Sequence, residues 1–156
     1  MTATPIRIIG IGNEWRGDDG FGPKVIASLH KAPIAGVDAF SVCDGLALLD
    51  AWHDAERVYV VDACCDGAGI GQVLRIDALR QPLPAIRRHS THAFGVAEAI
   101  ELGRNLRQLP RALTLIVARG ERFGLGNELS EAVQTAVERV VAMLRAECAP
   151  ASAQQH

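Results

Sequence analysis

The sequence predicts an α/β fold, a three-layer domain in which a mostly parallel sheet of about five strands lies between helices. Short apolar segments alternate with segments whose apolar residues recur at helical spacing along the 156 residues. Two short segments, Arg57–Ala63 and Ala112–Ala118, are apolar nearly throughout, which is typical of parallel strands covered on both faces. Strands that alternate with helices favour right-handed parallel crossovers, and hence this fold class.

The first strand–helix pair comes from an apolar run and the helical spacing that follows it. Ile6–Ile11 is the apolar run and is predicted to be the first strand. A helix is predicted to open at Gly22, because the proline that comes next suits the first turn of a helix. Spacings of three and four then place the apolar face of this helix at Gly22, Val25, Ile26 and Leu29.

The middle of the chain repeats the alternation. Val37–Cys43 is predicted to be the second strand, and a short helix through Leu46, Leu49 and Trp52 follows it. Arg57–Ala63 is predicted to be the third strand, and its run of aliphatic residues suits the centre of a parallel sheet.

The second half of the chain adds two strands and two helices. Gly71–Ala78 is predicted to be a more exposed strand, because charged and apolar side chains alternate along it. A helix is predicted from about Ala93 to Leu106, and Ala112–Ala118 is predicted to be the last strand. The final helix is predicted to begin near Ser130, since serine is a preferred N-cap residue.

Length and composition restrict the class of protein. We expect one catalytic domain over residues 1–148 and a flexible polar tail over residues 149–156. Sixteen Lys+Arg against eighteen Asp+Glu leave a net charge of −2, and no basic stretch exceeds Arg87-Arg88, so no nucleic-acid partner is expected. The absence of a secretory signal and of a long apolar run predicts a cytoplasmic protein without a membrane partner.

The four cysteines carry no metal-binding or redox spacing. None of them forms a C-x-x-C pair, and the adjacent Cys64 and Cys65 cannot easily bridge to one another. In a reducing compartment, all four are expected to be small buried apolar residues.

A glycine-rich loop, GIGNEWRGDDGFG over Gly10–Gly22, follows the first strand. It is not a dinucleotide-binding fingerprint, because Trp15 occupies the place of the third glycine, and it offers no P-loop lysine. Its three carboxylates would repel a phosphate: Glu14, Asp18 and Asp19. The sequence also lacks an H-E-x-x-H zinc helix and a G-x-S-x-G nucleophile elbow.

The acidic loop and Asp62 are expected to meet at one edge of the sheet. Sites in such sheets lie beyond the carboxyl ends of the strands, where the loop leaves the first strand and Asp62 ends the third. His92, in His89-Ser90-Thr91-His92, offers imidazole nitrogen just before a predicted helix. Two carboxylates and one histidine suit a divalent metal such as Zn, Ni, Mn or Fe(II) and leave coordination positions open.

Each of these residues also has a structural interpretation. Asp18 or Asp19 could cap the helix that follows the loop. Asp62 could accept backbone N–H bonds at a turn, and His92 could be a helix-start residue. From the residues alone, both interpretations stay open.

Three blocks of the sequence resemble the [NiFe]-hydrogenase maturation endopeptidases, and the resemblance spans nearly the whole chain. The blocks are Gly10-Ile11-Gly12-Asn13 with Asp18-Asp19-Gly20-Phe21-Gly22, Val60-Val61-Asp62-Ala63, and Ser90-Thr91-His92-Ala93-Phe94-Gly95. The resemblance implies a twisted, mostly parallel sheet between helices. It also implies that Asp19, Asp62 and His92 are the catalytic, metal-contacting residues. Relatives often have glutamate in place of Asp19, and an Asp-Gly-Gly-Thr-like turn in place of Asp44-Gly45-Leu46-Ala47.

The resemblance implies a processing enzyme. Members of the family remove a C-terminal peptide from the hydrogenase large subunit after nickel insertion, so the expected partner is the large-subunit precursor. Nickel would be carried by the substrate and engaged transiently, with no tightly bound cofactor. The metal could polarise the scissile carbonyl or activate water, or it could only license docking. The alternative functions are a non-catalytic nickel-binding chaperone or delivery factor and a nucleotide-binding regulatory domain.

Overall fold

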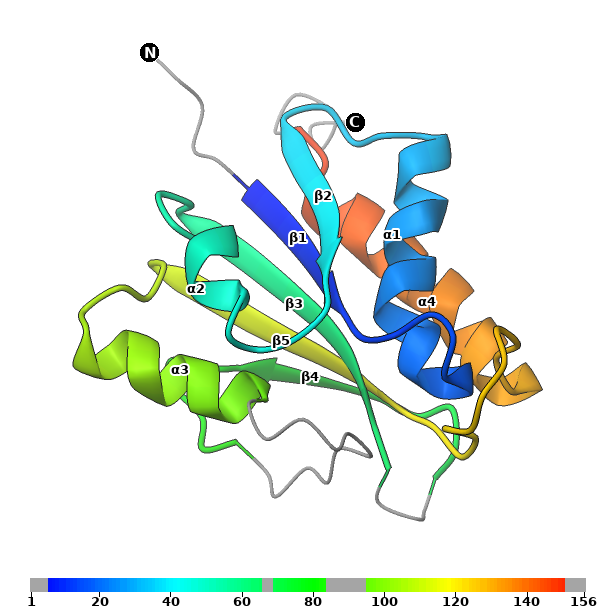
Figure 1. Cartoon of the computed structure of the whole chain (residues 1–156). Coiled ribbons are helices and arrows are strands. Elements are labelled where there is room, and N and C mark those ends of the chain that lie inside the picture. Colours follow the sequence, from blue (N-terminus) through cyan, green and yellow to red (C-terminus); the bar gives the residue numbers. More distant parts are fainter. Residues whose placement is uncertain (1–5, 66–68, 84–94, 151–156) are drawn as a thin grey trace.

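The computed structural model describes residues 6–65, 69–83 and 95–150, and within them a sheet is flanked by helices on both faces (Figure 1). The strands are β1 (Ile6–Ile11), β2 (Val37–Val42), β3 (Arg57–Cys64), β4 (Val73–Asp77) and β5 (Ala112–Arg119). The helices are α1 (Phe21–Lys31), α2 (Leu48–Ala51), α3 (Val96–Asn105) and α4 (Glu131–Glu147), with a short 3-10 helix, η1 (Gly17–Gly20), before α1.

The described strands form one mostly parallel sheet in the order β2-β1-β3-β5-β4. The pairs β1–β2, β1–β3 and β3–β5 are parallel, while β4 pairs with β5 antiparallel at one edge. This arrangement confirms the predicted fold class. The edge position of β4 explains its alternating sequence, because an edge strand is covered less completely than a central one.

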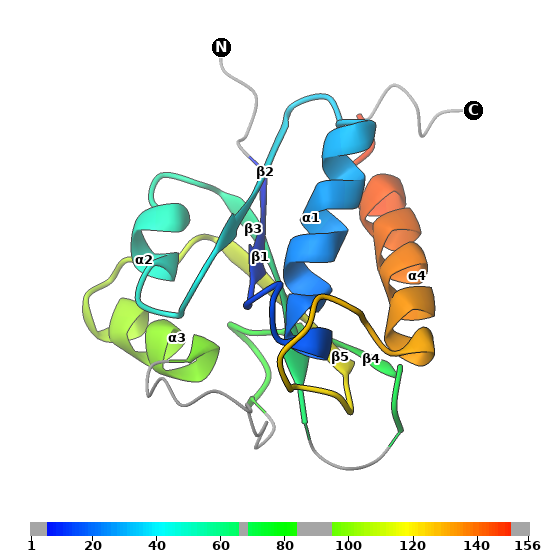
Figure 2. The same ribbon diagram turned by 45° about the vertical axis from the view of Figure 1, so that its right-hand side comes forward.

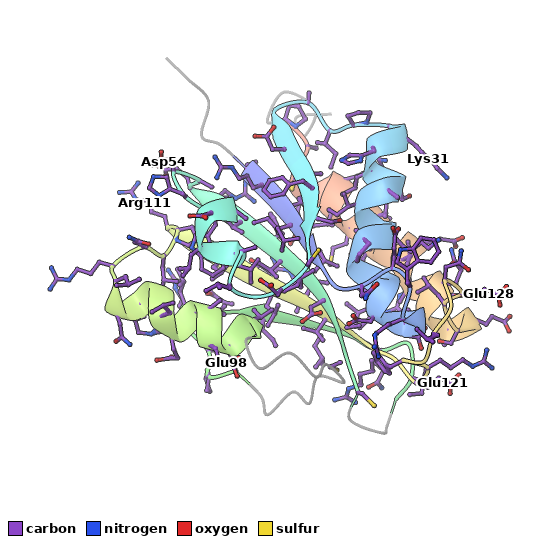
Figure 3. The ribbon with its side chains drawn as sticks, in the orientation of Figure 1. Lys31, Asp54, Glu98, Arg111, Glu121 and Glu128 are labelled. Atoms are coloured by element: carbon purple, nitrogen blue, oxygen red, sulfur yellow. The ribbon has the colours of Figure 1, made fainter. Side chains whose placement is uncertain are left out.

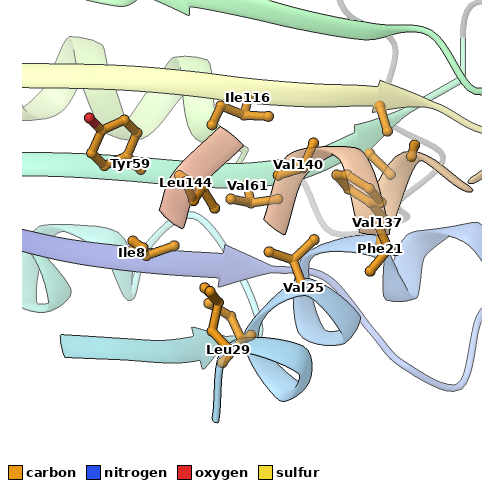
Figure 4. Close-up of a cluster of buried hydrophobic side chains, with 14 of the residues drawn as sticks. Ile8, Phe21, Val25, Leu29, Tyr59, Val61, Ile116, Val137, Val140 and Leu144 are labelled. Carbon is orange, nitrogen blue, oxygen red and sulfur yellow. The ribbon is translucent and has the colours of Figure 1, made fainter. Parts of the chain in front are cut away.

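Each face of the sheet has its own apolar core. Tyr59 and Val61 of β3 pack with α1 and α4 in one core, shown in Figure 4, whereas Val58 and Val60 pack in the other core with α2 and α3. Side chains alternate along a strand, so Asp62 belongs to the face that α2 and α3 cover. Burial on both faces explains why β3 is apolar nearly throughout.

The short helix after β2 differs from its predicted position. Leu46 is exposed, and the residues that α2 brings into the core are Leu48 and the C-cap residue Trp52. The reason is a turn before the helix, in which the Asp44 carboxylate accepts the Ala47 N–H at 3.1 Å. Leu46 lies within that turn and so points away from the core.

The cysteines are not all buried. Cys64 and Cys148 are buried, Cys65 is half-buried, and Cys43, which follows the edge strand β2, is exposed, contrary to the prediction. Burial raises the pKa of the Cys148 thiol, which therefore stays protonated near neutral pH. Among the described residues, no helix combines the length and apolarity that crossing a membrane would need. The helix predicted from about Ala93 begins at Val96, because Gly95 before it has an extended backbone and is its N-cap. Most of the predicted tail lies outside the described residues.

Candidate functional site

Two loops lie side by side at the carboxyl edge of the sheet, where the parallel strands β1, β2, β3 and β5 have their carboxyl ends. The loop from β1 to α1 is the acidic glycine loop, and the loop from β5 to α4 runs along it (Figure 2). The Gly17 N–H donates to the Gly126 carbonyl at 2.8 Å, and the Asp18 N–H donates to the Arg122 carbonyl. Backbone pairing between segments more than 100 residues apart therefore fixes the shape of this edge.

The glycines of the acidic loop allow close packing of backbone against backbone. A Cβ on Gly22 would lie 2.6 Å from the Val61 carbonyl oxygen and 2.7 Å from that of Ile11. A Cβ on Gly12, whose φ is +144°, would lie 2.0 Å from the Asp19 carbonyl oxygen. These positions let the start of α1 sit directly on β1 and β3, so the motif serves packing rather than phosphate binding.

Gly12→Ala is expected to lower the free energy of unfolding by about 2 kcal/mol or more, because the new methyl group overlaps the Asp19 carbonyl and φ is positive. Gly124→Ala is the matched control, because a Cβ there meets no atom within 4 Å. Urea unfolding of both variants measures the difference. Equal stability of the two variants would contradict the packing role of Gly12.

Asp19 lies half-buried in η1 at this edge. Its Oδ2 accepts the Asn13 N–H at 2.8 Å, which orients the carboxylate. Within the described parts of the chain, no donor hydrogen-bonds to its Oδ1. The Asn13 side chain in turn accepts the Trp15 N–H at 2.9 Å, so the loop holds its own geometry. One carboxylate oxygen of Asp19 is thus fixed by the loop while the other can accept a further ligand.

Asp62 lies near the end of β3 and is 4% exposed. Its Oδ1 accepts the N–H of the next residue, Ala63, at 2.8 Å, and this is not the residue's only interaction. Gly10 of β1 is opposite Val61, so Asp62 lies level with Ile11, where the acidic loop begins. η1 also packs against β3. The fold therefore brings the segments that carry Asp19 and Asp62 to the same edge.

His92 and His89 lie outside the described residues, so the third member of the predicted set has no described position. The helix that follows, α3, begins at Val96 with its N-cap at Gly95, whose N–H donates to the Glu98 carboxylate at 3.1 Å. Among the described side chains, no three His, Cys, Asp or Glu groups are placed to hold a metal ion. Metal contact by Asp19, Asp62 and His92 stays a prediction.

Asp18 is a buried structural carboxylate that sequence reasoning missed. It is fully buried and does not cap α1, whose N-cap is Gly20 without a side-chain hydrogen bond. Its two oxygens accept the backbone N–H groups of Glu121, Arg122 and Ser130 at 2.7–3.0 Å, and the Ser130 hydroxyl at 3.0 Å. Asp18 and Asp19 therefore have different tasks, since one faces the β5–α4 loop and the other does not.

Polar residues of the neighbouring loops have structural roles as well. Asp44 closes the turn before α2, as described above, and so acts as a turn acceptor. Glu121 donates its backbone N–H to Asp18, while its side chain is exposed. Figure 3 shows Glu121 and Glu128 projecting outward from the loop between β5 and α4. Ser130 is the N-cap residue of α4 as predicted, but its hydroxyl donates to Asp18 instead of capping the helix.

Comparison with known proteins gives consistent matches. A family model described as hydrogenase maturation protease matches residues 42–147. A Methanocaldococcus jannaschii protein assigned to the hydrogenase maturation proteases is 29% identical over 93% of this chain and 99% of its own length. The hydrogenase expression/formation protein HoxM of Azotobacter vinelandii is 30% identical over 88% of this chain and 69% of its own length.

Solved structures also match most of the chain. The [NiFe] hydrogenase maturation protease HycI of Thermococcus kodakarensis is 26% identical, with a TM-score of 0.69 over 90% of both chains. The hydrogenase maturating endopeptidase HybD of Escherichia coli has a TM-score of 0.69 over 92% of this chain and 93% of its own. Its identity of 20% supports the fold alone.

Proposed function

This chain belongs to the hydrogenase maturation protease family, and we propose that it removes a C-terminal peptide from the nickel-loaded large subunit of a [NiFe]-hydrogenase in the cytoplasm. Family membership makes it an endopeptidase. The observation that carries the rest of the proposal is the position of two carboxylate-bearing segments, the acidic loop and the end of β3, at one edge of the sheet. That edge is where enzymes with parallel sheets bind their substrates.

Nickel is part of the substrate in this proposal. Asp19 and Asp62, joined by His92, engage the nickel that the precursor already carries. Two carboxylates and one imidazole leave coordination positions for ligands from the precursor, whereas a permanent structural site has about four protein ligands. The orientation of Asp19 supports this role, because the Asn13 N–H fixes its Oδ2 and no described donor occupies its Oδ1. Engagement of the nickel then brings the scissile bond to the carboxyl edge.

Purified protein is expected to be folded, to contain no stoichiometric metal, and to cleave nickel-loaded precursor but not nickel-free precursor. Electrophoresis separates the precursor from the shortened product, and elemental analysis measures the metal. Chelator is expected to leave the protein folded, because two apolar cores hold the sheet together. A protein that retains a stoichiometric metal through dialysis and cuts nickel-free precursor equally well would contradict the proposal. A precursor that gains nickel but stays full length would identify a delivery factor instead.

A further inference from the structure

The exposed apolar side chains gather at the carboxyl edge. Four large hydrophobic residues are exposed in the described parts of the chain: Trp15, Leu46, Leu106 and Leu125. Three of them lie on loops that leave the carboxyl ends of β1, β2 and β5. Leu106 is the C-cap of α3 and precedes β5, so it lies at the opposite edge, where the parallel strands begin. Single exposed apolar residues are normal on a protein surface, but a group around one site indicates a binding surface.

Trp15 and Leu125 are held next to each other by the backbone. The Gly126 N–H donates to the Trp15 carbonyl at 2.9 Å, and Arg16 and Gly126 form a parallel bridge. Trp15 and Leu125 each come directly before a bridged residue, so their backbones are neighbours. The two residues are nevertheless 60% and 90% exposed. Two large apolar side chains are therefore presented to solvent from a fixed backbone, which lowers the entropic cost of binding a partner.

Leu46 lies on the loop that follows β2, the strand next to β1 in the sheet. In the sheet order β2-β1-β3-β5, its loop follows β2, the loop of Trp15 follows β1, and the loop of Leu125 follows β5. Asp62 ends β3, between them. The turn that carries Leu46 is closed by the Asp44 carboxylate. The strands that lead to Leu46 and Trp15 thus lie on one side of β3, and the strand that leads to Leu125 lies on its other side.

We propose that Trp15, Leu46 and Leu125 form an apolar docking rim that receives the folded large-subunit precursor around its nickel site. This inference rests on the proposed function, because it takes the precursor as the occupant. The rim lies on the loops that follow β1, β2 and β5, at the same edge as Asp19 and Asp62, so a partner seated on it delivers its metal to these carboxylates. Apolar contact supplies affinity that two carboxylates cannot, since buried aromatic anchors dominate most interfaces.

The charges around the rim favour a protein partner over a lipid surface. Glu121 and Glu128 project from the loop that carries Leu125 (Figure 3), and Glu14 is exposed beside Trp15. Two exposed arginines accompany them, Arg16 next to Trp15 and Arg122, whose Nε lies 4.0 Å from Glu121, so the rim has no excess of basic charge. Anionic lipid headgroups attract basic segments, and a rim without a basic excess lacks that attraction. A second copy of this chain on the same face would cover Asp19 and Asp62, and so would compete with the substrate.

The test compares Trp15→Ala and Leu125→Ser with the control Leu106→Ser. Leu106 is exposed as well, at 52%, but it lies at the opposite edge of the sheet. With nickel-loaded precursor, KM is expected to rise about tenfold or more in the two rim variants, with kcat within about twofold of wild type. Leu106→Ser is expected to match wild type. Thermal unfolding checks that all three variants are folded, and calorimetry with Asp62→Ala protein measures precursor binding without cleavage.

The two proposals fail in different ways. If wild-type protein cleaves precursor and the rim variants keep the KM and Kd of Leu106→Ser, the docking rim is wrong while the proposed function stands. If wild-type protein binds precursor through the rim but never cleaves it, the proposed function is wrong while the rim stands. A wild-type dimer that Leu125→Ser converts to a monomer, in sedimentation without precursor, would show that the rim joins copies of this chain and would overturn the inference.

Discussion

Asp62→Ala is expected to abolish removal of the C-terminal peptide while leaving the protein folded. In the proposed mechanism this carboxylate engages the substrate's nickel, and alanine offers no oxygen to replace it. Stability should change by no more than about 1.5 kcal/mol in either direction, because removing a buried carboxylate also removes the cost of its desolvation. The apolar neighbours of Asp62 on β3 stay in place, and they hold the strand between α1 and α3.

Two further variants separate charge from shape. Asp62→Asn keeps the size of the side chain and an oxygen for the Ala63 N–H, but loses the negative charge, so processing should fall with stability preserved. Asp77→Asn is the control, because the Asp77 carboxylate also accepts a backbone N–H, that of Leu79 at 3.2 Å. Asp77 lies at the end of the sheet opposite the candidate site, so this variant should process the precursor normally. Precursor mobility on a gel and urea unfolding measure both effects. If Asp62→Ala unfolds and wild type needs no metal, Asp62 is a turn acceptor.

Local pattern was enough to predict the central strands. β1 and β3 start where predicted, because strands covered on both faces of a sheet are apolar over most of their length. The apolar face of α1 was also predicted, since a spacing of three and four has only one helical interpretation. Leu46 was misplaced because a short helix shows too few turns to define its face, and the turn closed by Asp44 decides where it begins.

The site could be predicted only in part. The meeting of the acidic loop and Asp62 follows from a general property of parallel sheets, namely that the carboxyl ends of the strands share one edge. The role of Asp18 depends on the loop before α4, more than 100 residues away, and no local pattern reports such a contact. The local signal for two different roles was the pair Asp18-Asp19 itself. Neighbouring side chains in a tight turn point in different directions, so the two carboxylates meet different partners. The position of His92 lies outside the described residues.

Asp18→Ala is expected to cause the largest loss of stability among the substitutions proposed for this chain, about 3–5 kcal/mol. The carboxylate is fully buried and accepts three backbone N–H groups and one hydroxyl. Alanine leaves all four donors without their acceptor, because a methyl group accepts no hydrogen bond. The β5–α4 loop then keeps only its backbone hydrogen bonds to the acidic loop, so Asp19 and Leu125 should be held less firmly as well.

Graded variants test whether the hydrogen bonds carry this stability. Ser130→Ala removes only the hydroxyl donor and should cost about 1 kcal/mol. Asp18→Asn should fall between the two, because its amide nitrogen replaces one acceptor oxygen and faces N–H groups. Urea unfolding measures the series, and hydrogen exchange at Glu121 and Arg122 reports the loop directly. The opposite result would be an Asp18→Ala variant that is as stable as Ser130→Ala and keeps both amides protected. The β5–α4 loop would then hold its shape without the carboxylate, through the backbone hydrogen bonds that the Gly17 and Gly126 N–H groups donate.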